Sequence, residues 1–378
     1  MDYNILDIIS ILSLFIGLFF GVFLFSKHNK NKLSNKIFGA FLILCATDNI
    51  FLSKLLHTNF EGLSRFIAFG VFLQLPVFYL YVLSVCYSDF KLKPKHLLHA
   101  IPFVIVNILM ASTIFGINPD SKVLLLSGLT NDFKNAFIHV FVHIQVVSYL
   151  VAVFVVLRRA KKIYLENYAN ASIAFYTWLF QLTIVISILH SFAILKNIYK
   201  FSDYDTFYYW TRILLVLTEL IIFCWYVLKA LNTPELFKSV DSKLKLASNL
   251  VLNDAVTKEN KAVNTDVEAL QHYMTTKEPF LDSSLTMQDL ANQINSNPRD
   301  TSVLINHTIG KHFFDFVNEY RIEKAMRILE NPAKNKQTVL EILYEVGFNS
   351  KSSFNTAFKK HTGSTPTAYR KSNQNQVA

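Results

Sequence analysis

Ionisable residues interrupt long apolar runs in the first part of the chain, among them Asp48, His139, His143, His190 and Glu219. His139 and His143 are four residues apart, so a helix would carry both imidazoles on one face. There they could bind the polar group of a ligand, a proton or a metal ion. Hydrogen bonding between helices is the alternative role for the same pair. Two histidines do not complete a metal site, so we predict no metal and no cofactor.

The runs around these residues are apolar enough for a membrane. The chain of 378 residues is 52% hydrophobic and 17% charged, and its mean hydropathy is +0.31. Crossing the hydrocarbon layer of ~30 Å takes about 20 apolar helical residues. Seven runs have about this length, and we therefore expect a seven-helix transmembrane bundle over residues 1–231. The runs are 5–25, 37–56, 66–87, 97–115, 137–157, 172–195 and 210–231.

The charges of the loops predict how this bundle is oriented. Lys and Arg resist translocation, so the loops that carry more of them stay in the cytoplasm. The loops after the first, third and fifth runs hold eleven of these residues, and the opposite loops hold five. We therefore expect a multi-pass protein of the bacterial cytoplasmic (inner) membrane, with the N-terminus outside and the C-terminal region in the cytoplasm. The first run lacks the features of a cleaved signal peptide and is predicted to be a retained helix.

Residues 232–280 form a polar segment that we interpret as a cytoplasmic linker. It contains one short apolar stripe, Val267, Leu270 and Met274, which is typical of an amphipathic helix. The helix could serve in dimerisation or signal relay, or it could pack on the domain that follows. We favour packing on the next domain, because so short a stripe cannot support an independent coiled coil.

Residues 281–378 have the amphipathic pattern of a soluble helical domain. The stretch LTMQDLANQI predicts a helix, after which Asn297 can cap a second helix that begins at Pro298. The pattern recurs in TVLEILYEVGF, where Gly347 allows a tight turn and Asn349 or Ser350 caps the basic helix KSSFNTAFKK. A long connecting helix is expected between the two pairs. The chain is thus predicted to be all-α, with two helix-turn-helix units after the membrane helices.

The final hundred or so residues resemble the DNA-binding domain of the AraC/XylS family of transcription regulators. The most specific segment is EVGFNSKSSFNTAFKKHTGSTPTAYR, with its Gly-Phe turn, its Phe354 and Phe358 spacing, Gly363, and Tyr369-Arg370. Arg321 and Ala325 match the connecting helix of the family. In layout, the complete chain resembles the membrane-bound seven-helix members of that family found in flavobacteria and their relatives.

The resemblance implies that the two recognition helices enter successive segments of the major groove, about one helical turn (~34 Å) apart. Asn can pair with adenine through two hydrogen bonds, and Lys can reach guanine or phosphate. Val303 and Asn306 stand where many relatives have basic residues, so the first helix-turn-helix unit is expected to contact DNA weakly. In the second unit, Thr356 replaces a common Arg. The implied DNA contacts are Arg299, Ser302 and Asn306 in the first unit and Ser350, Lys351, Ser352, Asn355, Thr356 and Lys359 in the second.

Together these patterns predict a membrane-embedded, sequence-specific transcription regulator that couples a membrane or extracytoplasmic signal to gene expression. Its expected partners are double-stranded DNA at promoter sites and the lipid bilayer, with RNA polymerase, a second copy of the chain and an unidentified ligand as further candidates. The alternative is a transporter-like membrane protein whose cytoplasmic tail binds a protein. We do not expect an enzyme, because the sequence has no phosphate-binding Gly-rich loop, no nucleophile elbow and no HExxH motif.

Overall fold

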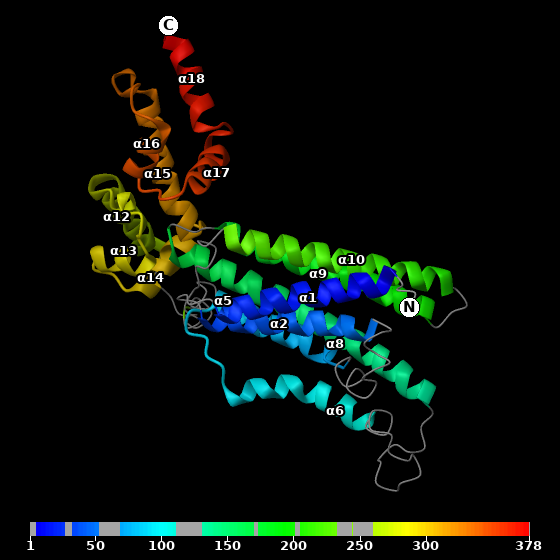
Figure 1. The fold of residues 1–378 in the computed structure, drawn as a ribbon. Helices are drawn as coiled ribbons and strands as arrows, with labels where there is room; N and C mark the ends of the chain where they lie inside the picture. The colour runs from blue at the N-terminus through cyan, green and yellow to red at the C-terminus, as the bar shows by residue number, and fades with distance from the viewer. Residues whose placement is uncertain are drawn as a thin grey trace. The chain divides into compact units, whose positions relative to one another are not determined.

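A computed structural model of the protein describes residues 5–26, 32–52, 69–110, 131–169, 173–200, 205–232, 244 and 260–377. Most residues in these ranges are helical and none of them forms a strand, which agrees with the predicted all-α class. The chain divides into two compact units (Figure 1). Unit 1 comprises Met1–Arg158 and Ala174–Ser239, and unit 2 comprises Arg159–Ile173 and Val240–Ala378.

Unit 1 contains a helix in each of the seven predicted apolar runs. The helices are α1 (Ile5–Ser26), α2 (Lys32–Leu52), α5 (Val71–Cys86), a 3₁₀ turn (Pro94–Ala100) that leads into α6 (Ile101–Leu109), α8 (Asn131–Asn167), α9 (Ile173–Lys200) and α10 (Asp205–Asn232). The last residues of α8 belong to unit 2, so the chain passes from one unit to the other within this helix.

Three helical stretches among the described residues are long and apolar enough to cross a membrane: Ile5–Phe25, Ala136–Asn167 and Tyr176–Lys200. The helices Val71–Cys86 and Pro94–Leu109 are apolar but shorter. Parts of the predicted runs, at 53–56, 66–68 and 111–115, lie outside the described residues, as do 233–243 and 245–259 of the predicted linker. A bundle of seven spanning helices therefore stays a prediction.

Helices α1 and α2 approach each other closely because small residues line their contact (Figure 1). Gly17 and Gly21 of α1 form a GxxxG pattern, and a β-carbon at either position would collide with α2. Their neighbours across the contact are Ala46 for Gly17 and Ile43 together with Gly39 for Gly21. Such stripes of small residues allow helix backbones to meet and pack in membranes, where the hydrophobic effect does not drive helix association.

Unit 2 holds two helix-turn-helix pairs joined by one long helix. The first pair is α13 (Met287–Gln293) and α14 (Pro298–Val303), which continues as a π-helical turn over Leu304–Thr308. The second pair is α16 (Val339–Glu345) and α17 (Lys351–Thr362), followed by α18 (Pro366–Val377). The connecting helix is α15 (Phe313–Glu330). This arrangement confirms the two predicted pairs and the connecting helix.

The connecting helix α15 contributes to a separate apolar core at each end. Its first turns, with Phe313 and Val317, pack in a core with Leu290 and Ile305 of the first pair. Its last turns pack in a second core with α16 and α17, to which it contributes Ile322, Ala325, Ile328 and Leu329. Each helix-turn-helix pair is thus anchored to one end of α15.

Helix caps and one glycine fix where the short helices of unit 2 begin and end. Thr286 and Thr338 each form a capping box, with Asp289 and Glu341 respectively. Ser350, rather than Asn349, caps α17. Gly347 has φ +89°, and a β-carbon there would meet the backbone of residues 280 and 281. The turn between α16 and α17 therefore requires glycine at this position.

The apolar stripe that the sequence placed in the linker lies in α12 (Asn260–Lys277). Leu270 and Met274 are buried in the first core of unit 2, beside Phe280 and Leu285. The favoured interpretation, a helix that packs on the following domain, is confirmed.

Candidate DNA-binding surface

Helix α17, in the second helix-turn-helix pair, has a buried aromatic face and an exposed polar face. Phe354 and Phe358 are fully buried, and they hold the helix against the second core. Around the helix from them, Lys351, Ser352, Thr356 and Lys359 are exposed and Asn355 is half-buried. Amphipathic spacing thus leaves the polar side of α17 facing away from the core of unit 2.

The polar face of α17 is available to an external partner. The side chains of Lys351, Ser352, Asn355, Thr356 and Lys359 make no hydrogen bond or ion pair to any other residue that the structure describes. Ser350 differs, because its hydroxyl caps the helix by accepting a hydrogen bond from the Ser353 amide. Lys360 also differs, because its ammonium pairs with Asp315 at 2.6 Å. Lysine and amide groups without internal partners are suited to reading base edges and holding phosphates.

The DNA contacts predicted in the first helix-turn-helix pair are less exposed than those of α17. Ser302 is buried, and Arg299 and Asn306 are half-buried. The Asn306 carboxamide accepts a hydrogen bond from the Phe313 amide at 2.9 Å and donates one to the Ser302 hydroxyl at 3.1 Å. Asn306 also donates to the backbone carbonyl of Glu166 at 3.3 Å. In this structure Asn306 therefore joins three segments of unit 2, whatever further role it has toward DNA.

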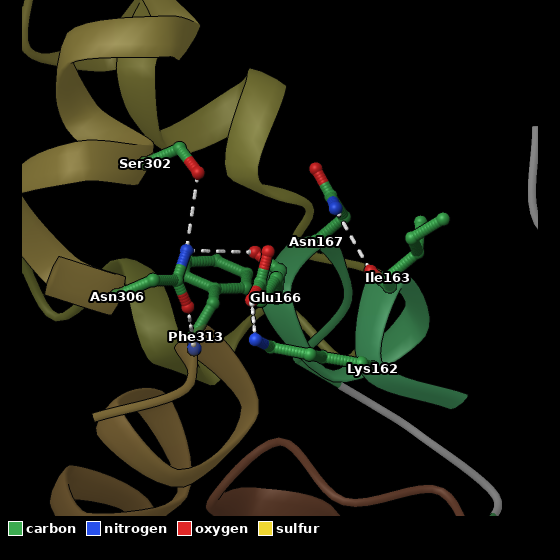
Figure 2. Close-up of polar contacts among 7 residues, drawn as sticks. All are labelled: Lys162, Ile163, Glu166, Asn167, Ser302, Asn306 and Phe313. Carbon is green, nitrogen blue, oxygen red and sulfur yellow. Dashed lines mark hydrogen bonds and ion pairs between the residues drawn. The ribbon is translucent and has the colours of Figure 1, made fainter. Parts of the chain in front are cut away.

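The end of α8 packs directly on the first helix-turn-helix pair, as Figure 2 shows. Glu166 is buried, and its carboxylate lies 3.9 Å from the Lys162 ammonium, one turn earlier. Just beyond the helix, the Ala169 amide donates to the Leu285 carbonyl at 3.2 Å, and Tyr168 forms an isolated antiparallel bridge with Thr286. Ala169 is itself a member of the first core.

Arg321 of α15 is fully buried and joins several segments of unit 2. Its guanidinium donates to the carbonyls of Phe280 at 2.6 Å, Asp282 at 2.7 Å and Ala169 at 3.2 Å. It also lies 5.4 Å from the ring of Phe348, in the turn of the second pair. Burial lowers the pKa of Arg321 to about 10, which leaves it charged at neutral pH.

The predicted histidine pair of unit 1 lies in a chain of hydrogen bonds between α8 and α9. Asn197 bonds to His143 at 3.0 Å and to His139 at 3.3 Å. His143 bonds in turn to His190 at 3.0 Å, and Lys200 bonds to His139 at 3.0 Å. Within the described ranges no group of three or more His, Cys, Asp or Glu residues could hold a metal ion. The geometry matches the alternative role, hydrogen bonding between helices.

The other two predicted residues, Asp48 and Glu219, both line a cavity of about 220 Å³ in unit 1. His190, Lys196 and Arg212 line the same cavity. His190 therefore belongs both to the cavity wall and to the histidine chain, so the predicted polar residues lie in two connected clusters.

Glu166, Ala169 and Arg321 were not among the predicted site residues. Arg321 stood out only as a match to the connecting helix of the AraC/XylS family. Glu166 and Ala169 gave no usable signal, because they act through backbone carbonyls that any residue type carries. His190 was already noted as an ionisable residue in an apolar run and Lys196 was counted among the loop cations, and the structure brings both to the cavity that Asp48 lines.

Comparison with known proteins identifies the domain that carries this surface. Residues 290–372 match the family described as a helix-turn-helix domain. This match spans both helix pairs and the connecting helix between them. The C-terminal domain is a DNA-binding domain of the AraC type.

The AraC-type domain is similar to parts of several proteins. Over 89 residues it is 32% identical to an uncharacterized HTH-type transcriptional regulator, YdeC, of Bacillus subtilis (strain 168), a match that covers 24% of this chain and 30% of that protein. Over 93 residues it is 29% identical to the Msm operon regulatory protein of Streptococcus mutans serotype c, covering 25% of this chain and 32% of that protein. The chain thus spans about a third of the length of these relatives.

Among solved structures, the chain is similar to the C-terminal domain of AraT, a response regulator from Geobacillus stearothermophilus. The two are 30% identical, with a TM-score of 0.25, and the match covers 28% of this chain and 84% of the other.

Proposed function

We propose that the chain is a membrane-embedded transcription regulator that couples a signal from the membrane or the outer face to gene expression. Its AraC-type domain binds promoter DNA, and the exposed face of α17 reads the sequence. The contacts we assign to this face are Ser350, Lys351, Ser352, Asn355, Thr356 and Lys359. Arg299, Ser302 and Asn306 of the first helix-turn-helix pair contribute less to DNA binding. The side chains of Ser302 and Asn306 already form hydrogen bonds to each other, and Asn306 also bonds to the Phe313 amide.

Membrane embedding is supported by the surfaces of the helices in unit 1. Large apolar side chains point outward along them, among them Phe15 of α1 (67% exposed) and Ile221 of α10 (65% exposed). Monomeric soluble proteins rarely leave such surfaces open to water, whereas lipid covers them without cost. With the excess of Lys and Arg in one set of loops, this supports seven spans, with the N-terminus outside and the AraC-type domain in the cytoplasm.

The observation that carries the coupling is the path of α8. Residues Ala136–Asn167 form one of the three helical stretches long and apolar enough to cross a membrane. The last turn of that helix and the residues just after it hold Asn306 and Arg321 through the carbonyls of Glu166 and Ala169. A signal that moves or reorients α8 would therefore act on both the first helix-turn-helix pair and the connecting helix. If the signal is a ligand, it must bind the two positions of α8 with different affinity in order to shift the balance between them.

Chromatin immunoprecipitation of the tagged full-length protein tests this function. We expect discrete promoter peaks for the wild type that disappear in a Lys351→Ala, Asn355→Ala variant. Lys336→Ala is the matched control, because Lys336 is an exposed lysine outside α17 and its loss should leave the peaks in place. If no sequence-specific peaks form under any growth condition, the DNA-binding role is wrong. A search for transported solutes and for protein partners of the tail would then follow.

A further inference from the structure

The cavity of unit 1 lies between α2, α5, α9 and α10, and most of its wall is apolar. Phe41, Leu75, Leu189 and Val216 contribute one side chain from each of these helices. Its volume of about 220 Å³ can be compared with an apolar cavity of about 150 Å³, which holds benzene. By that measure it accommodates a ligand of about nine non-hydrogen atoms. The wall and size together suit a small, largely apolar molecule.

Two cations face this cavity from neighbouring helices. Lys196 comes from α9 and Arg212 from α10, and they are close enough for their charges to repel each other. Asp48 offsets the charge of Lys196, with which it interacts electrostatically. Glu219, two helical turns from Arg212 on the same face of α10, is likewise not without interaction partners. Both acidic residues of the wall thus have interaction partners. The remaining charged residue of the wall is Arg212.

Arg212 has less support from the protein than its burial requires. Its Nε is buried and finds no hydrogen-bond partner among the described residues, and its guanidinium lies 5.4 Å from the ring of Tyr208. Although Arg212 as a whole is half-buried, a buried guanidinium nitrogen without an acceptor is costly. A carboxylate is the group that best matches it, because the two oxygens accept from the planar guanidinium in a paired geometry.

We propose that the cavity binds a small amphiphile whose carboxylate pairs with Arg212 and Lys196 and whose apolar body lies against Leu75, Leu189 and Val216. His190 lines the cavity and bonds to His143 of α8, so a single side chain separates the occupant from α8. The role of this ligand as the signal rests on the proposed function. Its binding to unit 1 does not.

The test measures binding of octanoate to the full-length protein in lipid nanodiscs by isothermal titration calorimetry. Octanol and octylammonium serve as probes with the same chain and a neutral or cationic head. The variant is Arg212→Met, and Arg158→Met is the matched control because Arg158 is an exposed arginine that lies outside the cavity. Arg212→Lys retains the charge, and its folding and that of Arg212→Met are checked by tryptophan fluorescence.

We expect saturable octanoate binding that weakens about tenfold or more in Arg212→Met, is partly kept in Arg212→Lys and is unchanged in Arg158→Met. Octanol and octylammonium should bind more weakly than octanoate. Equal binding of octanoate and octanol, an unchanged affinity in folded Arg212→Met, or no saturable octanoate binding would each overturn the proposal. Promoter binding is measured on the same preparation. Octanoate binding without promoter binding would contradict the proposed function and leave the ligand site standing.

Discussion

The side-chain amide of Asn306 donates a hydrogen bond to the backbone carbonyl of Glu166, a residue 140 positions earlier in the chain. Asn306 occupies a position that the sequence assigned to DNA contact, and Glu166 lies in the last turn of the helix α8. The same side chain therefore stands at the point where the segment after an apolar helix meets the first helix-turn-helix pair (Figure 2). Two roles for Asn306 can be separated by experiment.

Replacing Asn306 with Ala should loosen the segment around Glu166. A net hydrogen bond contributes about 1 kcal/mol, so amide hydrogen exchange of residues 163–169 should quicken by about fivefold. Asn292→Ala is the control, because Asn292 is exposed and its side chain accepts a hydrogen bond from Gln288, one turn earlier in the same helix. Lost promoter binding with unchanged exchange at 163–169 would instead mean that Asn306 acts on DNA.

Replacing Arg321 with Met should strongly destabilise unit 2. The substitution leaves the carbonyls of Phe280, Asp282 and Ala169 buried without their donor, at a cost of about 3 kcal/mol or more. Differential scanning calorimetry is the suitable measurement, because all three tryptophans of the chain lie in unit 1 and do not report on unit 2. Arg327→Met, on the exposed side of the same helix, should melt like the wild type. Equal melting of the two variants would show that the buried network is dispensable.

Introducing Val at Gly17 should separate α1 from α2. The added β-carbon collides with Ala46, and overpacking of this kind costs about 1–3 kcal/mol. Tryptophan fluorescence of the protein in detergent, which reports on unit 1, should show a lower melting temperature. Leu18→Val, at a more exposed position of the same helix, should have little effect. If Gly17→Val melts with the wild type, α1 does not need this contact.

The capping box of α16 should make the start of this helix sensitive to acid. Hydrogen bonds from the Thr338 amide and hydroxyl lower the pKa of Glu341 below its ordinary value of 4.5. Because the folded-state pKa is the lower one, the stabilisation is complete above about pH 4.5 and is lost as the pH falls through the folded-state value. Hydrogen exchange of residues 339–345, corrected for its intrinsic pH dependence, should therefore quicken below pH 4.5.

A Glu341→Gln variant removes the titrating group and should abolish that acid-dependent step. Glu323→Gln is a suitable control, because Glu323 is an exposed carboxylate on α15. A step that persists in Glu341→Gln would have to come from another carboxylate of the domain, such as Glu345, whose pKa is lowered by Gln337 and Lys334.

The local structure of unit 2 could be predicted from sequence because its signals are local. Asn297 as a cap, Gly347 at a left-handed turn, and the Phe354 and Phe358 spacing each act within a few residues, and each is confirmed. The packing of the apolar helices of unit 1 was harder to predict. Apolar runs locate helices, but hydropathy cannot say which helices are neighbours, so the joining of Asp48, Lys196 and Arg212 at one cavity was not foreseeable.

Contacts made by the backbone were also beyond prediction. A carbonyl looks the same at every residue, so nothing in the sequence around Ala169 marks it as a partner of Arg321, 152 positions away. Ser302 and Asn306 illustrate the related difficulty at a recognition helix. Polar residues suit both a surface that faces DNA and a buried hydrogen-bond network, and the residue types alone do not distinguish these surroundings.

The place of Ala169 in the first core has a consequence for release of the AraC-type domain by proteolysis. A protease that cut the chain between Asn232 and Asn260 would sever the covalent tether, but the domain would still be held by the carbonyls of Glu166 and Ala169. Release of the domain would also require residues 166–169 to dissociate from the first core of unit 2. The end of α8 therefore acts as a non-covalent retainer, and under the proposed function cleavage alone would give a nicked, two-chain protein that stays at the membrane.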